Sequence, residues 1–278
     1  LDQDPNNSIA LQLFGVLASQ IKQNDFALAL LSKAVTLNPF YEEARNNRSV
    51  VLKELKRFDE ALDDLNKAIA LNPNYTDAFN NRGIVLRELQ RRDEAIQDFD
   101  KAIELKPDHV EAFNNRGNVM RDMHRFDQAL ADYDKAIELR PDYADAIANK
   151  STCLLLLEDF EAGWPLYEWR RHRKENTIGE PLDTSKPMWK GEKGKNVFVW
   201  AEQGIGDEIM FASLIPELQE MSSHVIIQCD ERLIPLFERS FRGQITFYPK
   251  NNEVPEELYD FHISIGSLPL ILRPSLES

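Results

Sequence analysis

Apolar and small residues recur in the first part of this chain at intervals of 34 positions, and each interval holds two stretches of helical periodicity. In the third interval these stretches are Tyr75 to Gln90 and Asp93 to Leu105, with a polar turn between them. A proline follows each second stretch, where it prevents the helix from continuing. We therefore predict antiparallel helix pairs that stack to bury their apolar faces. The recurring positions are Pro5, Pro39, Pro73, Pro107 and Pro141; Ala27, Ala61, Ala95 and Ala129; Ala34, Ala68, Ala102 and Ala136; and Leu31, Leu65, Phe99, Tyr133 and Tyr167.

These columns resemble those of the tetratricopeptide repeat (TPR) family over about residues 8 to 173. The resemblance implies an α-helical TPR solenoid, wound as a right-handed superhelix, in a domain spanning residues 1–173. A fifth, modified unit departs from the pattern, because Gly163 and Arg170 stand where alanines belong. The second helix of this unit is rich in aromatic residues, which predicts a terminal repeat that either covers the end of the stack or docks onto the segment that follows. Of the two we favour docking.

Asparagines form two more columns on the first helix of each pair, which lines the concave surface in TPR proteins. An amide side chain donates and accepts, so a row of amides can hold a passing peptide backbone. The second column resembles the asparagine ladder of O-linked N-acetylglucosamine transferases. A peptide groove and an inert polar face both remain open. If the groove is used, alanine at Asn81 and Asn115 should weaken partner binding without lowering thermal stability. The columns are Asn46, Asn80 and Asn114, and Asn47, Asn81, Asn115 and Asn149.

A basic column follows the second asparagine column, and an acidic column recurs on the second helices of the pairs. We interpret the two columns as salt bridges along the stack. The alternative is that the basic side chains bind a carboxylate of a ligand. The basic column is Arg48, Arg82, Arg116 and Lys150, and the acidic column is Asp64, Asp98 and Asp132.

The helical period stops after residue 173. Residues 174–196 are rich in Gly, Pro, Lys and Glu and predict a linker, which Trp189 could fasten to a neighbouring element. Residues 197–278 alternate strands with helices, which predicts a smaller α/β Rossmann-like domain with a parallel sheet. The predicted strands are Asn196–Ala201, His224–Cys229, Gln244–Tyr248 and Phe261–Ile265, and the predicted helices are Glu208–Met221 and Glu231–Phe241.

A glycine-containing loop follows the first predicted strand and includes Gln203, Gly204 and Gly206. Ligands gather at the carboxyl ends of strands in such folds, and glycines allow a ligand to approach the backbone closely. One interpretation is a dinucleotide site with Asp230 as the ribose acceptor. Two features argue against it, because the third glycine of that fingerprint is missing and acidic residues occupy the place of the pyrophosphate.

This loop and its helix resemble the start of heptosyltransferase-like GT-B glycosyltransferases, as do the flanking segments Pro187–Gly191 and Tyr259–His262. The resemblance covers about residues 187 to 278 and implies a general base, whose role would fall on Asp207. The alternative for Asp207 is a helix N-cap. A GT-B enzyme has two such halves, and the second mainly holds the nucleotide sugar. Since this chain stops after about one half, we expect no cofactor in it and no binding of a nucleotide sugar.

The composition of the chain restricts the classes of partner that it can bind. The formal net charge of −14 and the sequence pI near 4.9 disfavour nucleic acid. Apolar runs are far shorter than a membrane span requires. Cys153 and Cys229 give no disulfide framework, so a cytoplasmic protein is expected, and the five histidines show no metal-ligand spacing.

The sequence therefore predicts protein–protein interaction through a concave TPR groove. The groove would present a partner or acceptor to a glycosyltransferase-like domain that is incomplete in this chain. The alternative is a non-catalytic scaffold or adaptor in which the α/β segment is structural.

Overall fold

The computed structural model describes residues 6–173, 182–202 and 204–275 of the chain. The chain divides into two compact units, Leu1–Ala146 (unit 1) and Ile147–Ser278 (unit 2). The division falls within the helix that opens the fifth repeat, so the predicted boundary at the end of the repeats lies inside unit 2.

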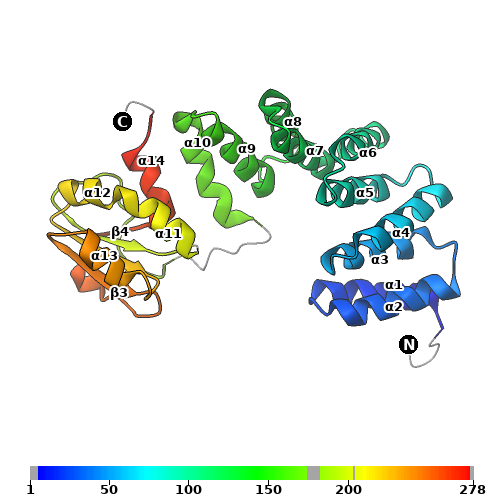
Figure 1. The fold of residues 1–278 in the computed structure, drawn as a ribbon, viewed down its shortest axis with the longest axis horizontal. Coiled ribbons are helices and arrows are strands. Elements are labelled where there is room, and N and C mark those ends of the chain that lie inside the picture. The colour runs from blue at the N-terminus through cyan, green and yellow to red at the C-terminus, as the bar shows by residue number, and fades with distance from the viewer. Residues whose placement is uncertain (1–5, 174–181, 203, 276–278) are drawn as a thin grey trace. The chain divides into compact units, whose positions relative to one another are not determined.

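Unit 1 consists of consecutive antiparallel helix pairs, as the 34-residue period predicts (Figure 1). Every turn between paired helices contains one non-glycine residue with positive φ, for example Gln90 at 61°. This left-handed residue lets the chain leave the first helix and enter the second at once. The helices are α1 (Ser8–Gln20), α2 (Asn24–Leu37), α3 (Glu42–Glu54), α4 (Phe58–Leu71), α5 (Thr76–Glu88), α6 (Arg92–Leu105), α7 (Val110–Asp122) and α8 (Phe126–Leu139).

The repeated alanine and large apolar columns form the core of unit 1. Ala61, Ala95, Leu65 and Phe99 are completely buried. A Cβ atom at Gly83 would come within 3 Å of the Phe99 ring, so glycine permits the two helices of that pair to approach closely. The predicted division into small contact positions and large space-filling positions is therefore confirmed.

The fifth helix pair leads into unit 2 through α9 (Ala144–Leu156), α10 (Phe160–Tyr167) and the 3₁₀ helix η1 (Glu168–His172). Trp164 and Tyr167 pack against the apolar core of the following sheet. The aromatic second helix of this repeat therefore docks onto the segment after it, as predicted.

A four-stranded, fully parallel sheet with strand order β3-β2-β1-β4 forms the rest of unit 2. Trp189, fully buried in the sheet core, donates its backbone N–H to His262 O at 2.8 Å and fastens the preceding segment to β4. The elements are β1 (Asn196–Trp200), α11 (Ile205–Phe211), η2 (Ala212–Leu214), α12 (Ile215–Met221), β2 (His224–Cys229), α13 (Ile234–Ser240), β3 (Ile245–Pro249), η3 (Glu256–Leu258), β4 (Phe261–Ser264), η4 (Ile265–Ser267) and α14 (Leu268–Leu272).

The two faces of this sheet are covered differently. Val197 and Val199 pack with residues of α11, α12, α13 and α14, whereas Phe198 and Trp200 face loop residues such as Val254. The strand predictions are confirmed within one residue at most ends.

The helix predictions need two corrections, both caused by proline. The predicted helix Glu208–Met221 is broken at η2, because Pro216 cannot donate to the carbonyl four residues earlier. The predicted helix Glu231–Phe241 begins only at Ile234, where Pro235 occupies the first turn. Among the described residues, each helix is too short or too polar to cross a membrane.

Candidate functional site

Buried asparagines join neighbouring helix pairs in unit 1. Asn46 and Asn80, from the first predicted column, are 5% and 8% exposed. The Asn81 amide donates to Asn46 Oδ1 at 2.9 Å, and the Asn115 amide donates to Asn80 Oδ1 at 3.0 Å. Each bond runs from the second column of one pair to the first column of the preceding pair. Of the remaining predicted asparagines, Asn114 and Asn149 are buried and Asn47 is half-buried.

These bonds change one expectation for the asparagine columns. Alanine at Asn81 would leave the buried Asn46 oxygen without its donor, which costs about 1–3 kcal/mol. We therefore no longer expect alanine substitutions at Asn81 and Asn115 to leave thermal stability unchanged. A loss of binding in such a variant would not by itself identify a groove.

Asn81 also lines a shallow hollow of about 40 Å³ formed by α3 and α5. Val50 and Ile84 supply apolar wall, Lys53 supplies an ammonium group that pairs with the exposed Glu54 at 2.9 Å, and Asn81 is half-buried. One N–H of Asn81 is bound to Asn46, and the rest of its amide borders this hollow. The hollow therefore offers an apolar surface, an amide and a cation side by side.

The basic and acidic columns form the predicted salt bridges. Arg82 binds Asp98 through both Nε and Nη2, each at 2.7 Å, and Asp98 is nearly buried. Asp132 accepts from Nε and Nη2 of Arg116 in the same bidentate arrangement, which raises the pKa of that guanidinium. The third nitrogen of each arginine reaches back to the second helix of the preceding pair. These backward contacts are Arg48 to Ser32 at 3.5 Å, Arg82 to Asn66 at 2.8 Å and Arg116 to Asp100 at 2.5 Å.

In unit 2, the glycine loop runs from the carboxyl end of β1 into α11, and Gln203 lies outside the described residues. Gly204 is the N-cap of α11, so the half-buried Asp207 stands in the first turn and is not the cap. Apart from the adjacent residues and the backbone of its own helix, no described atom lies within 4 Å of the place where a Cβ on Gly206 would be. Packing therefore does not require glycine at residue 206.

Glu208, in the first turn of α11 after this loop, is a buried carboxylate. Its Oε2 accepts from the Asp230 backbone N–H at 2.7 Å, which ties α11 to the end of β2. Burial raises the pKa of Glu208, and the bond from Asp230 opposes that rise. The Asp230 carboxylate is bound by Arg232, whose hydrogen bonds hold the pKa of Asp230 well below its usual range.

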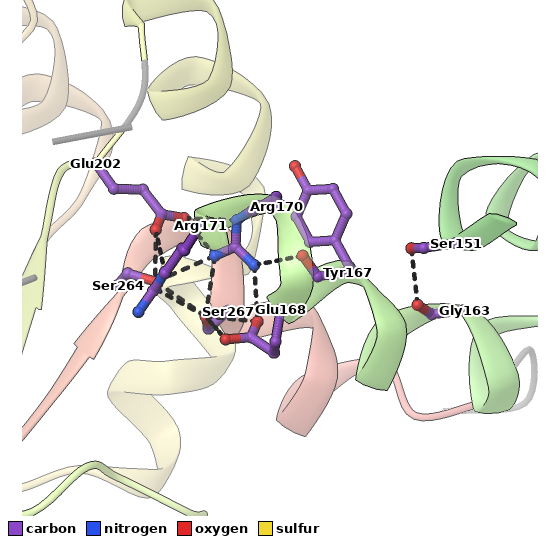
Figure 2. Close-up of polar contacts among 9 residues, drawn as sticks. All are labelled: Ser151, Gly163, Tyr167, Glu168, Arg170, Arg171, Glu202, Ser264 and Ser267. Atoms are coloured by element: carbon purple, nitrogen blue, oxygen red, sulfur yellow. Dashed lines mark hydrogen bonds and ion pairs between the residues drawn. The ribbon is translucent and has the colours of Figure 1, made fainter. Parts of the chain in front are cut away.

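A buried ionic cluster fills the carboxyl ends of β1 and β4 (Figure 2). Arg170, 5% exposed, donates through Nη2 to Glu202 Oε1 at 2.5 Å and through Nη1 to Glu168 at 2.8 Å. Arg171 donates to the second oxygen of Glu202 at 3.0 Å. The cluster joins η1 to the ends of two strands. Its other members are Ser264 and Ser267, and the rings of Tyr167 and Trp200 lie beneath the guanidinium groups of Arg170 and Arg171.

The cluster is closely packed and internally neutral, because its two arginines face two glutamates. A Cβ atom on Gly266 would overlap Glu202 Oε1, so only glycine fits beside this carboxylate. The strand ends where a parallel sheet commonly receives ligands are therefore occupied by side chains of this chain.

Sequence reasoning found some of these residues and missed others. Arg170 was visible as a departure from the buried alanine column, but its partner Glu202 lies 32 positions away and has no periodic signal. Val50 and Ile84 were missed because their column becomes polar in the next two repeats, at Asn118 and Thr152.

The tetratricopeptide repeat family matches residues 76–109 and 110–143, and a related TPR repeat family matches residues 51–90. Protein FlbA of Caulobacter vibrioides is 33% identical over 96 residues, which are 33% of this chain and 16% of FlbA. This chain therefore spans about a sixth of the length of that relative.

Two solved structures share the helical fold. PilF of Pseudomonas aeruginosa aligns with a TM-score of 0.54 at 23% identity, over 58% of this chain and 74% of PilF. A thermophilic TPR protein of Thermus thermophilus aligns with a TM-score of 0.56 at 18% identity, over 61% of this chain and 93% of that one.

Proposed function

Because this chain contains tetratricopeptide repeats, we propose that unit 1 binds an extended segment of a partner protein along its first helices. The observation that carries the proposal is the hollow bordered by Asn81, Val50 and Ile84. Such a site suits a peptide whose backbone pairs with an amide while an apolar side chain enters the hollow. Asn46, Asn47, Asn80, Asn114, Asn115 and Asn149 extend the same columns along the stack.

The charge of the site restricts the peptide. Lys53 borders the hollow, and Arg87 lies on the same side of the next first helix, where it pairs with Asp122 at 2.6 Å. The peptide we propose therefore combines an apolar anchor with a nearby acidic group for Lys53. Since the whole chain is acidic, long acidic peptides would be repelled elsewhere, which favours a short motif.

The test selects peptides from a randomised library on the intact chain and measures their affinity for variants. Ile84→Ser and Lys53→Ala change the hollow without removing a bond between repeats. Each should weaken the selected peptides by about tenfold, the effect of roughly 1.4 kcal/mol. Phe40→Ser, at an exposed turn outside the hollow, is the matched control. Equal affinity of Ile84→Ser and the intact chain would overturn the proposal.

We further propose that the sheet of unit 2 is the Rossmann-like first half of a heptosyltransferase-like glycosyltransferase, to which the groove presents a protein acceptor. The parallel order β3-β2-β1-β4 supports this, because it is the order of the first strands of a doubly wound fold. Asp207 is the candidate base, and Gln203, Gly204 and Gly206 form the candidate ligand loop. A nucleotide sugar would be held mainly by a second half. A cytoplasmic site of action fits two buried thiols outside any disulfide.

The ionic cluster favours a second candidate function, a scaffold in which the sheet is structural. Arg170 and Arg171 occupy the strand ends where a ligand would enter, and their charges are already neutralised. Calorimetry with UDP-linked and ADP-linked sugars tests the first candidate. We expect no heat of binding from this chain alone, and micromolar binding would contradict that expectation. Asp207→Asn, assayed in a chain that includes a second α/β half, would show whether Asp207 acts as a base.

A further inference from the structure

The first helix, α1, exposes a continuous apolar stripe. Leu13, Leu17 and Ile21 are 56%, 55% and 66% exposed, and Ile9 and Phe14 lie on the same side of the helix. Their spacing of three or four residues places them along one face. The opposite face of α1 carries the residues that pack against α2. An exposed stripe of this size on a helix that is already paired marks a surface for another element.

The positions of Leu17 and Ile21 are packed against the preceding pair in every later repeat of unit 1, whereas Ile9 corresponds to the exposed Glu43 and Asp77. Leu17 corresponds to Val51, Val85 and Val119, since each lies 34 positions after the last, and all three valines are at most 1% exposed. Val51 is buried against Ala27 and Leu31 of the preceding helix pair. The part of the α1 stripe formed by Phe14, Leu17 and Ile21 is therefore the surface on which, elsewhere in unit 1, the second helix of a preceding pair lies.

Phe14 indicates the chemistry of an element that would lie on this stripe. It stands in the column of Arg48, Arg82 and Arg116, whose side chains reach a polar atom on the preceding second helix. A phenyl ring cannot make that bond, so an apolar residue is required opposite it. The second helices of this chain carry Ser32, Asn66, Asp100 and Asp134 at that position. A second copy of this chain that stacked through one of these second helices would therefore place a polar residue opposite Phe14.

We propose that the apolar face of α1 is the docking surface for a further helical hairpin of the TPR type. The second helix of this hairpin lies along α1 as α2 lies along α3, and it carries an apolar side chain opposite Phe14. Docking buries Phe14, Leu17 and Ile21 and extends the stack by one repeat.

The test supplies the hairpin in the same polypeptide, so that docking does not depend on concentration. A copy of residues 42–75 is placed directly before Ser8, with the copied Asn66 changed to Leu in one version and to Asp in another. Hydrogen exchange at the α1 amides is the readout. The Leu version should slow exchange in α1 at least tenfold, and the Asp version should slow it less.

A swapped pair of variants provides the control. In a chain carrying Phe14→Arg, the order should reverse, because arginine pairs with the Asp version as Arg116 pairs with Asp100. Unchanged exchange in α1 with both hairpins would overturn the proposal. A concentration-dependent dimer of the unextended chain, dissolved by Phe14→Arg in sedimentation experiments, would also overturn it, because a second copy would then be the occupant.

Discussion

The two units place arginine beside carboxylates in opposite ways. In unit 1, Arg82 keeps 23% of its side chain exposed and grips one nearly buried aspartate, and the arrangement recurs in neighbouring repeats. In unit 2, Arg170 is 5% exposed and the cluster around it occurs once. A repeated, partly solvated bridge spreads stability over many junctions, whereas a single buried cluster concentrates it. In unit 1, the loss of one arginine–carboxylate pair should therefore destabilise only the neighbouring repeats. In unit 2, the loss of the single cluster should destabilise the whole unit.

The largest effect is expected from Glu202→Gln. The substitution leaves the buried Arg170 and the half-buried Arg171 with a single carboxylate in the cluster, which should lower the unfolding free energy of unit 2 by about 3–5 kcal/mol. All four tryptophans lie in unit 2, so denaturation followed by tryptophan fluorescence reports on that unit. Glu231→Gln, at an exposed position, is the matched control.

A second variant separates charge from shape. Replacing both partners, Arg170→Met with Glu202→Leu, removes the buried charges together and should recover most of the loss. An unfolding midpoint for Glu202→Gln equal to that of the intact chain would show that the cluster does not hold unit 2 together.

A smaller and local effect is expected in unit 1 from Asp98→Asn. It removes the charge that binds two nitrogens of Arg82, a loss of about 2 kcal/mol. Hydrogen exchange should quicken in α5 and α6 and stay unchanged in α1 and α2, because repeats are coupled mainly to their neighbours. Glu94→Gln breaks the exposed bridge to Arg91 and should have no measurable effect. Uniform loss of protection across unit 1 would contradict the contrast between the units.

Acidification should affect unit 2 through His262. Burial lowers the pKa of this histidine, as does the charge of Arg171, and its Nδ1 accepts from Trp200 Nε1 at 3.2 Å. The folded state therefore binds fewer protons than the unfolded state, so stability is present above pH 6.5 and is lost as pH falls through the folded pKa. Fluorescence-monitored unfolding between pH 7 and pH 5 should show a smaller loss for His262→Gln. His224→Gln, at the first residue of β2, should keep the original profile.

The smallest expected change is a gain from Gln90→Gly. A left-handed conformation costs a non-glycine residue about 1–2 kcal/mol, and part of this is offset because glycine is freer in the unfolded chain. We expect a net gain below about 1 kcal/mol, measured by the thermal unfolding of helical ellipticity. Glu88→Gly, two residues earlier and inside α5, should instead lower stability. Opposite signs at the two positions would show that the backbone conformation is responsible.

The sequence predicts unit 1 well because the same 34-residue pattern recurs several times along the chain. Ala95 and Phe99 share their columns with other repeats, so their burial could be inferred by counting, and the bridge from Arg82 to Asp98 followed from two such columns. The bonds between asparagines could not be inferred, because a polar column alone does not say whether its amides face a ligand or one another.

Unit 2 shows the limit of this reasoning. Its strands follow from apolar runs, but the contact of Arg170 with Glu202 depends on how the last repeat meets the sheet. Neither residue has a repeated counterpart that would reveal the pairing. The break at η2 was in principle readable, because Pro216 stands four residues after Ala212.

The backward contacts of the arginine column differ from one junction to the next. Arg48 meets a hydroxyl at 3.5 Å, Arg82 an amide at 2.8 Å and Arg116 a carboxylate at 2.5 Å. Hydrogen bonds to charged partners are stronger, so the bond from each arginine to the preceding second helix becomes stronger from the amino-terminal end of unit 1 onward. Under tension applied to the ends of the stack, the junction between α2 and α3 should part first and that between α6 and α7 last. Unit 1 would then lengthen in ordered steps, with one junction between helix pairs opening at a time.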